Sequence, residues 1–371
     1  MDTLCCVDAD AHFNEPAELW SDYLDPEFKW AAPAMKQDNQ GRMRPMIGGE
    51  VMPFIPIPQL SEGQEKRQGA KNAALRLADM DKEGIDVMAL YPTLGLFFFG
   101  VKDPRASAAL CNAYNRWAHD HCSIAPDRLI APCVIPQIDP GACVREAEHS
   151  LRTLGLSGVL MRPNPIGGRN LDNPAWDDLW SLLEETGQPL ILHEGTTQDV
   201  PQVGSERFDN FLYRHMVSHP FEQQMALMSL IFGGVLERHP KLNVMVVECG
   251  VGWVPYWMDR MDDHQEHWGH ASLKLRERPS DYFRRQCFVA AGWAETLLPF
   301  VVDAFGDDNL CFSTDYPHQD HPFDGVVDEI RKMEGLSDTS KAKILGGNAA
   351  RLFGLQDRYV APRLQGEAQH A

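Results

Sequence analysis

The stretch Val7-Asp8-Ala9-Asp10-Ala11-His12 decides the fold, because alternation along a strand puts both carboxylates and the imidazole on one face. Four later segments also place metal-binding side chains after what we predict to be a β-strand, at residues 190–195, 218–220, 244–250 and 313–318. A parallel barrel brings the carboxyl ends of its strands to one face. The five segments therefore predict one metal site at the mouth of such a barrel.

From residue 68 onward, β-type runs alternate with amphipathic helical patterns at the spacing of βαβ units. We predict strands at 4–10, 87–91, 129–135, 158–161, 189–193, 242–248, 286–290 and 310–314. Helices are predicted between them at 72–83, 107–124, 177–186 and 221–232. A chain of 371 residues can hold a barrel of about 250 residues with insertions. We therefore predict an α/β fold, a (β/α)8 TIM barrel that forms a single domain over 1–371.

Three segments interrupt this pattern. Residues 25–64 are rich in Pro, Met and Gly and follow the first strand, which predicts a lid-like insertion over the catalytic face. A second irregular stretch, 196–215, follows the fifth strand. The tail over 356–371 is predicted to be peripheral.

The composition limits the classes of partner that the chain can bind. A net charge of −19 argues against nucleic acid or an anionic membrane surface as a partner. The nine cysteines form no C-x-x-C pair, and no signal peptide or long apolar span is present, which predicts free thiols in the cytoplasm. The sequence leaves open whether the chain forms a homo-oligomer.

The order of these segments resembles the amidohydrolase superfamily, in the branch of aminocarboxymuconate-semialdehyde decarboxylase and the aromatic-acid decarboxylases. The resemblance rests on Asp10-x-His12, on His193, on Asp315 within Thr-Asp-Tyr-Pro, and on the segments 232–242, 252–256 and 347–353. It implies the barrel and a metal-dependent activity.

Three positions depart from the family pattern. Asp10 stands where the family has the first His of an H-x-H pair. Glu248 aligns with the strand-six His that activates water or substrate in the relatives. Arg162 follows strand four, where dinuclear members carry a lysine that forms a bridging carbamate.

The candidate metal ligands are carboxylates and imidazoles, with no thiolate beside them: Asp10, His12, His193, Glu194, His219, Glu248, Asp315 and His318. Such an oxygen-rich set suits iron or manganese better than structural zinc, and zinc or manganese is the alternative to iron. One ion needs three or four protein ligands, so the surplus favours two ions bridged by a carboxylate. Whether Glu194, His219 and His318 bind metal or orient the ligands stays open.

The leading functional hypothesis is a non-haem iron monooxygenase, with one or two irons, that hydroxylates a hydrophobic carboxylated substrate such as a terpenoid acid or its thioester. The chain also resembles a di-iron, terpenoid-hydroxylating branch of the superfamily, and this activity would require an electron donor. The rival is a hydrolase or decarboxylase that uses zinc or manganese, with Glu248 or His219 moving the proton.

Two further alternatives concern binding. Arg162 is placed to bind a substrate carboxylate bidentately, or to pair with a neighbouring carboxylate of the chain itself. A non-catalytic barrel that binds a small molecule is the alternative outside enzymes. The joint presence of Asp10, His12, His193 and Asp315 argues against it, because a mere binder needs no set of four ligands.

Overall fold

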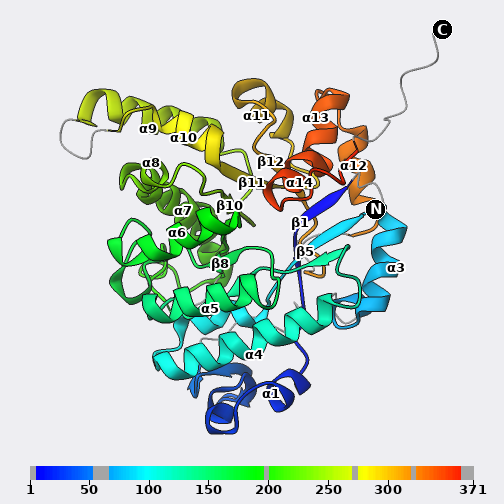
Figure 1. The fold of residues 1–371 in the computed structure, drawn as a ribbon, viewed down its shortest axis with the longest axis vertical. Coiled ribbons are helices and arrows are strands. Elements are labelled where there is room, and N and C mark those ends of the chain that lie inside the picture. The colour runs from blue at the N-terminus through cyan, green and yellow to red at the C-terminus, as the bar shows by residue number, and fades with distance from the viewer. Residues whose placement is uncertain (1–5, 53–66, 196–199, 270–274, 319–322, 361–371) are drawn as a thin grey trace.

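The computed structural model describes residues 6–52, 67–195, 200–269, 275–318 and 323–360 (Figure 1). The first residues of the predicted first strand and the end of the predicted tail, 361–371, lie outside this part of the chain. Parallel strands occupy the centre of the molecule, and helices surround them (Figure 1). The strands are β1 (Val7–His12), β5 (Val87–Tyr91), β6 (Leu129–Ile130), β7 (Cys133–Val134), β8 (Val159–Met161), β9 (Leu190–Leu192), β10 (Val244–Val246), β11 (Cys287–Gly292) and β12 (Leu310–Ser313).

The strands pair in two parallel sheets, in the orders β1-β5-β6 and β12-β11-β10-β9-β8-β7. The two sheets meet at both ends. The backbone N–H of Asp315, just after β12, donates to Asp10 O of β1 at 2.8 Å. On the other side, only residues 131 and 132 separate β6 from β7. Pro132 lacks an N–H and cannot continue a ladder, so the predicted strand 129–135 is split in two.

Helices follow the strands as the hydrophobic pattern predicts. The helices with bounds closest to prediction are α3 (Ala73–Glu83), α4 (Pro104–Cys122) and α6 (Asp177–Thr186). The others are α1 (Glu18–Asp22), α5 (Pro140–Arg152), α7 (Phe211–Phe232), α8 (Val235–Arg238), α9 (Val254–Trp268), α10 (Pro279–Gln286), α11 (Leu298–Phe305), α12 (Val326–Lys332), α13 (Asp338–Ala342) and α14 (Asn348–Leu352). Among the described residues, no helix is both long and apolar enough to cross a membrane.

The core explains why the strands are continuous apolar runs. Every residue of β5, β8, β9 and β10 is buried, as expected for a parallel sheet that is covered on both faces. The polar side chains of β1 are the exception, because Asp8, Asp10 and His12 are buried as well. Buried charge without compensation is costly, so these three side chains must be explained by the site.

The insertion after β1 has more order than its composition predicts. Within its described part, β2 (Ala34–Gln37), β3 (Met43–Ile47) and β4 (Glu50–Val51) form an antiparallel sheet. Residues 53–64 of the predicted segment lie outside the described residues. The glycines 41, 48 and 49 adopt positive φ in the turns between these strands, which is why a Gly-rich segment forms a sheet here.

Candidate metal centre

The face of β1 that carries Asp8, Asp10 and His12 points toward the ends of the neighbouring strands. Asp8 is fixed by strand β12, since its carboxylate accepts from Thr314 N at 3.0 Å and from Thr314 Oγ1 at 2.5 Å. Burial raises the pKa of Asp8 to about 7. This residue therefore joins β1 to β12 beneath the site.

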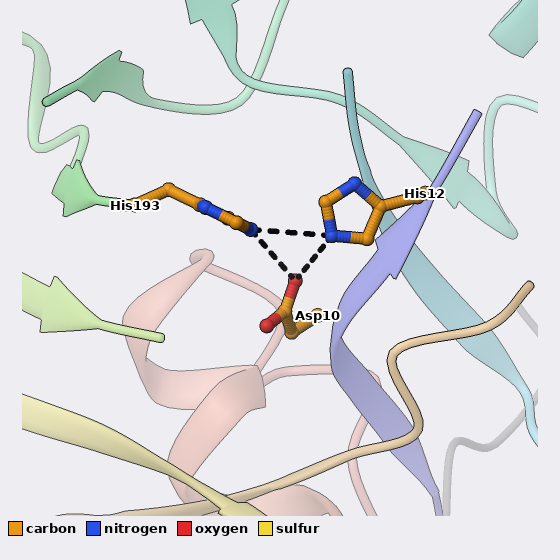
Figure 2. Close-up of side chains that lie close together, drawn as sticks. All are labelled: Asp10, His12 and His193. Atoms are coloured by element: carbon orange, nitrogen blue, oxygen red, sulfur yellow. Dashed lines mark hydrogen bonds and ion pairs between the residues drawn. The ribbon is translucent and has the colours of Figure 1, made fainter. Parts of the chain in front are cut away.

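Asp10, His12 and His193 converge at the carboxyl ends of β1 and β9 (Figure 2). The Nε2 atoms of the two imidazoles lie 3.2 Å apart. The Oδ1 atom of Asp10 lies 3.5 Å from Nε2 of His12 and 3.9 Å from Nε2 of His193. All three side chains are almost completely buried.

The hydrogen bonds of the two imidazoles define which nitrogen faces the centre with a lone pair. Nδ1 of His12 lies 2.9 Å from the carbonyl oxygen of Pro92, and Nδ1 of His193 lies 2.5 Å from that of Glu194. A carbonyl oxygen only accepts, so both Nδ1 atoms donate and both Nε2 atoms turn lone pairs inward. Burial also lowers the pKa of His193 to about 3, which keeps its ring neutral.

Asp315, directly after β12, adds a fourth acceptor. Its Oδ1 atom lies 3.2 Å from Nε2 of His12 and 2.9 Å from Nδ1 of His318, whose ring stacks on that of His12. Burial raises the pKa of Asp315, but the positive charge of the neighbouring His318 imidazole opposes burial, and the pKa lies well below the usual range. Asp10 has the opposite shift, since burial and then the charges of Asp315 and Glu248 raise its pKa.

These four side chains fit a divalent cation. Oδ1 of Asp10 and both carboxylate oxygens of Asp315 are buried and accept no hydrogen bond of ordinary geometry from the described residues. Without a cation between them, these carboxylate oxygens and the two inward Nε2 lone pairs would repel one another. A cation replaces that repulsion with coordination bonds, and imidazoles oriented by carbonyls are the usual arrangement around a bound metal.

Glu248 approaches the same centre from β10 with an unusual backbone. Within the described residues, Glu248 and Asp315 are the non-glycine residues with positive φ, both at 52°. The left-handed region costs about 1–2 kcal/mol for such residues and is characteristic of functional sites. Each carboxylate thus leaves its strand on a sharp turn. Oε2 of Glu248 then lies 3.5 Å from Nε2 of His193.

The structure corrects the predicted placement of His219. Residues 218–220 do not follow a strand; they lie inside α7, which continues through Pro220. His219 nevertheless reaches the centre, with Nε2 3.4 Å from Oε2 of Glu248. Burial lowers the pKa of His219, but the charge of Glu248 and the hydrogen bond to it outweigh burial and raise it.

The sequence analysis missed His215, which α7 brings to Glu248 as well. Its Nε2 atom lies 3.9 Å from Oε1 of Glu248. His215 was assigned to the predicted irregular stretch 196–215, whereas in the structure α7 already begins at Phe211. The signal was present in the spacing, since residues four apart share one face of a helix.

Arg162 and Glu194 form a buried ion pair beside the centre, with Nη2 of Arg162 3.0 Å from Oε2 of Glu194. Asn164 and Gln202 also donate to the Glu194 carboxylate, at 2.9 and 2.7 Å. Of the two arrangements that the sequence leaves open for Arg162, the structure has the pairing with a neighbouring carboxylate. Glu194 contributes its backbone oxygen to His193, while its side chain faces Arg162.

The chain is similar to several decarboxylases and to an amidohydrolase of known structure. The chain is 26% identical to gamma-resorcylate decarboxylase from Rhizobium sp. (strain MTP-10005), over 89% of the chain and 97% of that protein. An amidohydrolase from Mycobacterium avium subsp. paratuberculosis K-10 superposes with a TM-score of 0.79 at 24% identity, covering 95% of this chain and 99% of that one. The manganese complex of 5-carboxyvanillate decarboxylase from Novosphingobium aromaticivorans has a TM-score of 0.71 at 25% identity, covering 95% and 96%.

These relatives overturn the leading functional prediction. They indicate a decarboxylase, a lyase, where an iron monooxygenase was predicted, and they give no support to iron or to an electron donor. The prediction failed because an oxygen-rich ligand set suits manganese as well as iron. The ligand types alone therefore do not choose between redox and non-redox chemistry.

The remaining findings agree with the predicted fold and resemblance. The solved relatives are barrels of the amidohydrolase superfamily, which confirms the α/β barrel. A divalent metal site is supported by the manganese in the solved 5-carboxyvanillate decarboxylase and by the cluster around Asp10. The amidohydrolase family model matches residues 7–355, nearly the whole length. The chain belongs to the amidohydrolase family.

Proposed function

We propose that the chain is a metal-dependent decarboxylase of a small aromatic acid. The observation that carries the proposal is the convergence of four side chains, those of Asp10, His12, His193 and Asp315. The two imidazoles present lone pairs, and within the described part of the chain Oδ1 of Asp10 and both oxygens of Asp315 accept no hydrogen bond of ordinary geometry. The decarboxylating relatives support the reaction class.

The ion that these four residues would hold is manganese. Two carboxylates and two neutral imidazoles suit Mn²⁺, and manganese is the ion in the solved 5-carboxyvanillate decarboxylase. When bound, the ion supplies positive charge that binds the oxygens of the acid and stabilises the electron pair left by the departing carboxyl group.

The chain's own residues must supply one proton. In decarboxylation the bond between ring carbon and carboxyl carbon breaks, its electron pair stays on the ring carbon, carbon dioxide leaves, and the ring carbon takes a proton. His219 is the donor in our proposal, from Nε2, because the carboxylate of Glu248 at 3.4 Å stabilises the charged imidazolium. His219 is buried and the Glu248 side chain is only 15% exposed, which limits the access of bulk water to this proton.

Arg162 has a supporting role in this proposal. Its Nη1 and Nη2 atoms donate to the carbonyl oxygens of Leu96 and Gly195 and to the Glu194 carboxylate. The residue thereby holds the loop after β9, whose carbonyl at Glu194 orients His193. We therefore assign Arg162 to positioning and leave the substrate carboxylate to the ion.

The test is a panel of aromatic acids with metal-free protein and with protein loaded with Mn²⁺. The panel contains 2,6-dihydroxybenzoate and 5-carboxyvanillate, with benzoate as the control that lacks ring hydroxyls. We expect carbon dioxide release from at least one hydroxylated acid, dependent on the metal and equally fast without oxygen. No release from any acid by the loaded protein, or release that requires oxygen, would refute the proposal.

A further inference from the structure

The His215, His219 and Glu248 side chains form a second group of metal-type ligands beside the first. His215 and His219 are four residues apart on α7, and their rings stack with centroids 4.1 Å apart at an interplanar angle of 22°. One ligand atom from each of the three residues lies within 4.8 Å of the others. A pair of histidines at this spacing on a helix is a known way to bind a metal ion, because one rigid face presents both rings.

The distances among these ligand atoms are close to those around a bound ion. Nε2 of His219 and Nε2 of His215 lie 3.4 Å and 3.9 Å from the two oxygens of Glu248. Two ligands about 2.1 Å from a tetrahedral ion stand about 3.4 Å apart. The His219 distance equals this separation, and the His215 distance exceeds it by half an ångström, so a small approach of His215 completes the site.

We propose that His215, His219 and Glu248 form a second divalent-cation site that shares Glu248 with the first. Oε2 of Glu248 lies almost equally far from Nε2 of His193 in the first site, 3.5 Å, and from Nε2 of His219 in the second, 3.4 Å. A carboxylate in this position can bridge two ions, as in enzymes whose paired metals stand about 3.5–4 Å apart.

The charges of the combined cluster favour a second ion. Asp10, Asp315 and Glu248 bring three carboxylates into one connected, largely buried group. With His219 neutral, as it must be when it binds a metal, one divalent ion leaves this group with a negative charge, whereas two ions and one anionic acid bring it to neutrality. An unneutralised buried charge is costly, so the second ion stabilises the complex with an acid.

The ligand types identify the ion as zinc. Two histidines and one glutamate with an open fourth position are a zinc set of hydrolytic enzymes. The first site has more carboxylate character, which suits manganese. The two sites thus differ in the ion that they prefer.

The second ion has a consequence that rests on the proposed function. A nitrogen bound to a metal carries no proton, so zinc on His219 prevents this residue from protonating the ring carbon. Zinc at the second site is therefore an inhibitor of decarboxylation, while the binding itself requires no assumption about the reaction.

The binding test counts ions on the full chain without substrate. Protein stripped with a chelator is loaded with Mn²⁺, titrated with Zn²⁺, passed through a desalting column and measured by mass spectrometry of its metals. We expect wild type to retain two ions per chain and His215→Gln to retain one. The matched control is His267→Gln at an exposed position of α9, which should retain two.

Two results would overturn the site. One is a wild type that retains a single ion at saturating Zn²⁺; the other is a His215→Gln variant that still retains two. Circular dichroism of each metal-free variant verifies that it is folded. A second readout is the electron paramagnetic resonance spectrum of Mn²⁺ in the first site, which should change when Zn²⁺ is added to wild type and stay unchanged in His215→Gln.

The activity test separates this inference from the proposed function. Decarboxylation by the manganese-loaded wild type should fall as Zn²⁺ fills the second site, and His215→Gln should need at least about tenfold more Zn²⁺ for the same inhibition. No decarboxylation by the manganese-loaded wild type before Zn²⁺ is added, together with two ions retained after Zn²⁺ is added, refutes the proposed function and leaves the site standing. Decarboxylation with one ion at most refutes the site and leaves the function standing.

Discussion

At the scale of single residues, the centre consists of electron-rich side-chain atoms that repel one another when no cation is bound. Asp10 is the clearest case, because its buried Oδ1 atom accepts no hydrogen bond from any residue that the structure describes, and burial and neighbouring carboxylates raise its pKa. In Asp10→Asn, Mn²⁺ should bind at least about 100-fold more weakly, while the metal-free protein should unfold with equal or greater free energy. Calorimetric titration and urea unfolding in chelator measure the two quantities. A less stable metal-free variant would show that Asp10 serves the fold.

For Arg162 and Glu194 we predict the opposite effect on stability, because each of the two buried charges compensates the other. Arg162→Gln leaves the Glu194 carboxylate buried without its cation, and should lower the free energy of unfolding by about 3–5 kcal/mol. Glu194→Gln should cost a similar amount, and the double variant should cost less than the two together. Urea unfolding of the four proteins measures this coupling. If Arg162 instead bound the substrate, the single variant would raise KM at unchanged stability.

At the scale of elements, α7 carries His215 and His219 to the centre and is held there by Glu222. Oε1 of Glu222 accepts from Val203 N at 2.6 Å, and burial raises the pKa of Glu222 to about 7. A raised pKa in the folded state means that stability from this group is complete below pH 4.5 and is lost as the pH rises through 7. Relative to wild type, Glu222→Gln should therefore gain on the order of 2 kcal/mol between pH 5 and pH 8. Urea unfolding at both pH values tests this; a pH-independent difference would contradict it.

The sheet inserted after β1 provides a second prediction at this scale. The hairpin of β2 and β3 contributes none of the ligands, and its first strand is exposed throughout. We propose that it forms part of a lid, so replacing residues 38–42 by a two-residue Asn-Gly turn should raise KM and leave the metal content unchanged. Metal analysis and kinetics on the same preparation provide the comparison. Normal kinetics in the shortened variant would exclude a lid at this position.

The elements also show where sequence reasoning succeeds. The polar side chains at the ends of predicted strands could be identified from the sequence, because alternation and barrel geometry fix where a strand-terminal side chain lies. They are Asp10, His12, His193, Glu248 and Asp315. His219 was found by its residue type and placed on the wrong element, because Pro220 suggests a break where tertiary packing maintains a helix. His215 was missed for the same reason. The partner of Arg162 depended on loop geometry that no local pattern contains.

At the scale of the whole molecule, the family and the barrel could be predicted from the sequence and the reaction could not. The order of motifs over residues 7–355 identifies the family. The choice between oxidation and decarboxylation depends on substrate and ion, which the ligand types leave undetermined.

In the function that we propose, this metal centre removes a carboxyl group from the substrate, and a proton replaces it. The most direct measurement is an anaerobic reaction in D₂O with the acid that releases carbon dioxide, followed by nuclear magnetic resonance of the product. We predict one deuterium at the vacated ring carbon for each carbon dioxide formed, no reaction after treatment with chelator, and recovery on addition of Mn²⁺. A product that contains oxygen from O₂, or turnover that survives complete removal of the metal, would contradict the account.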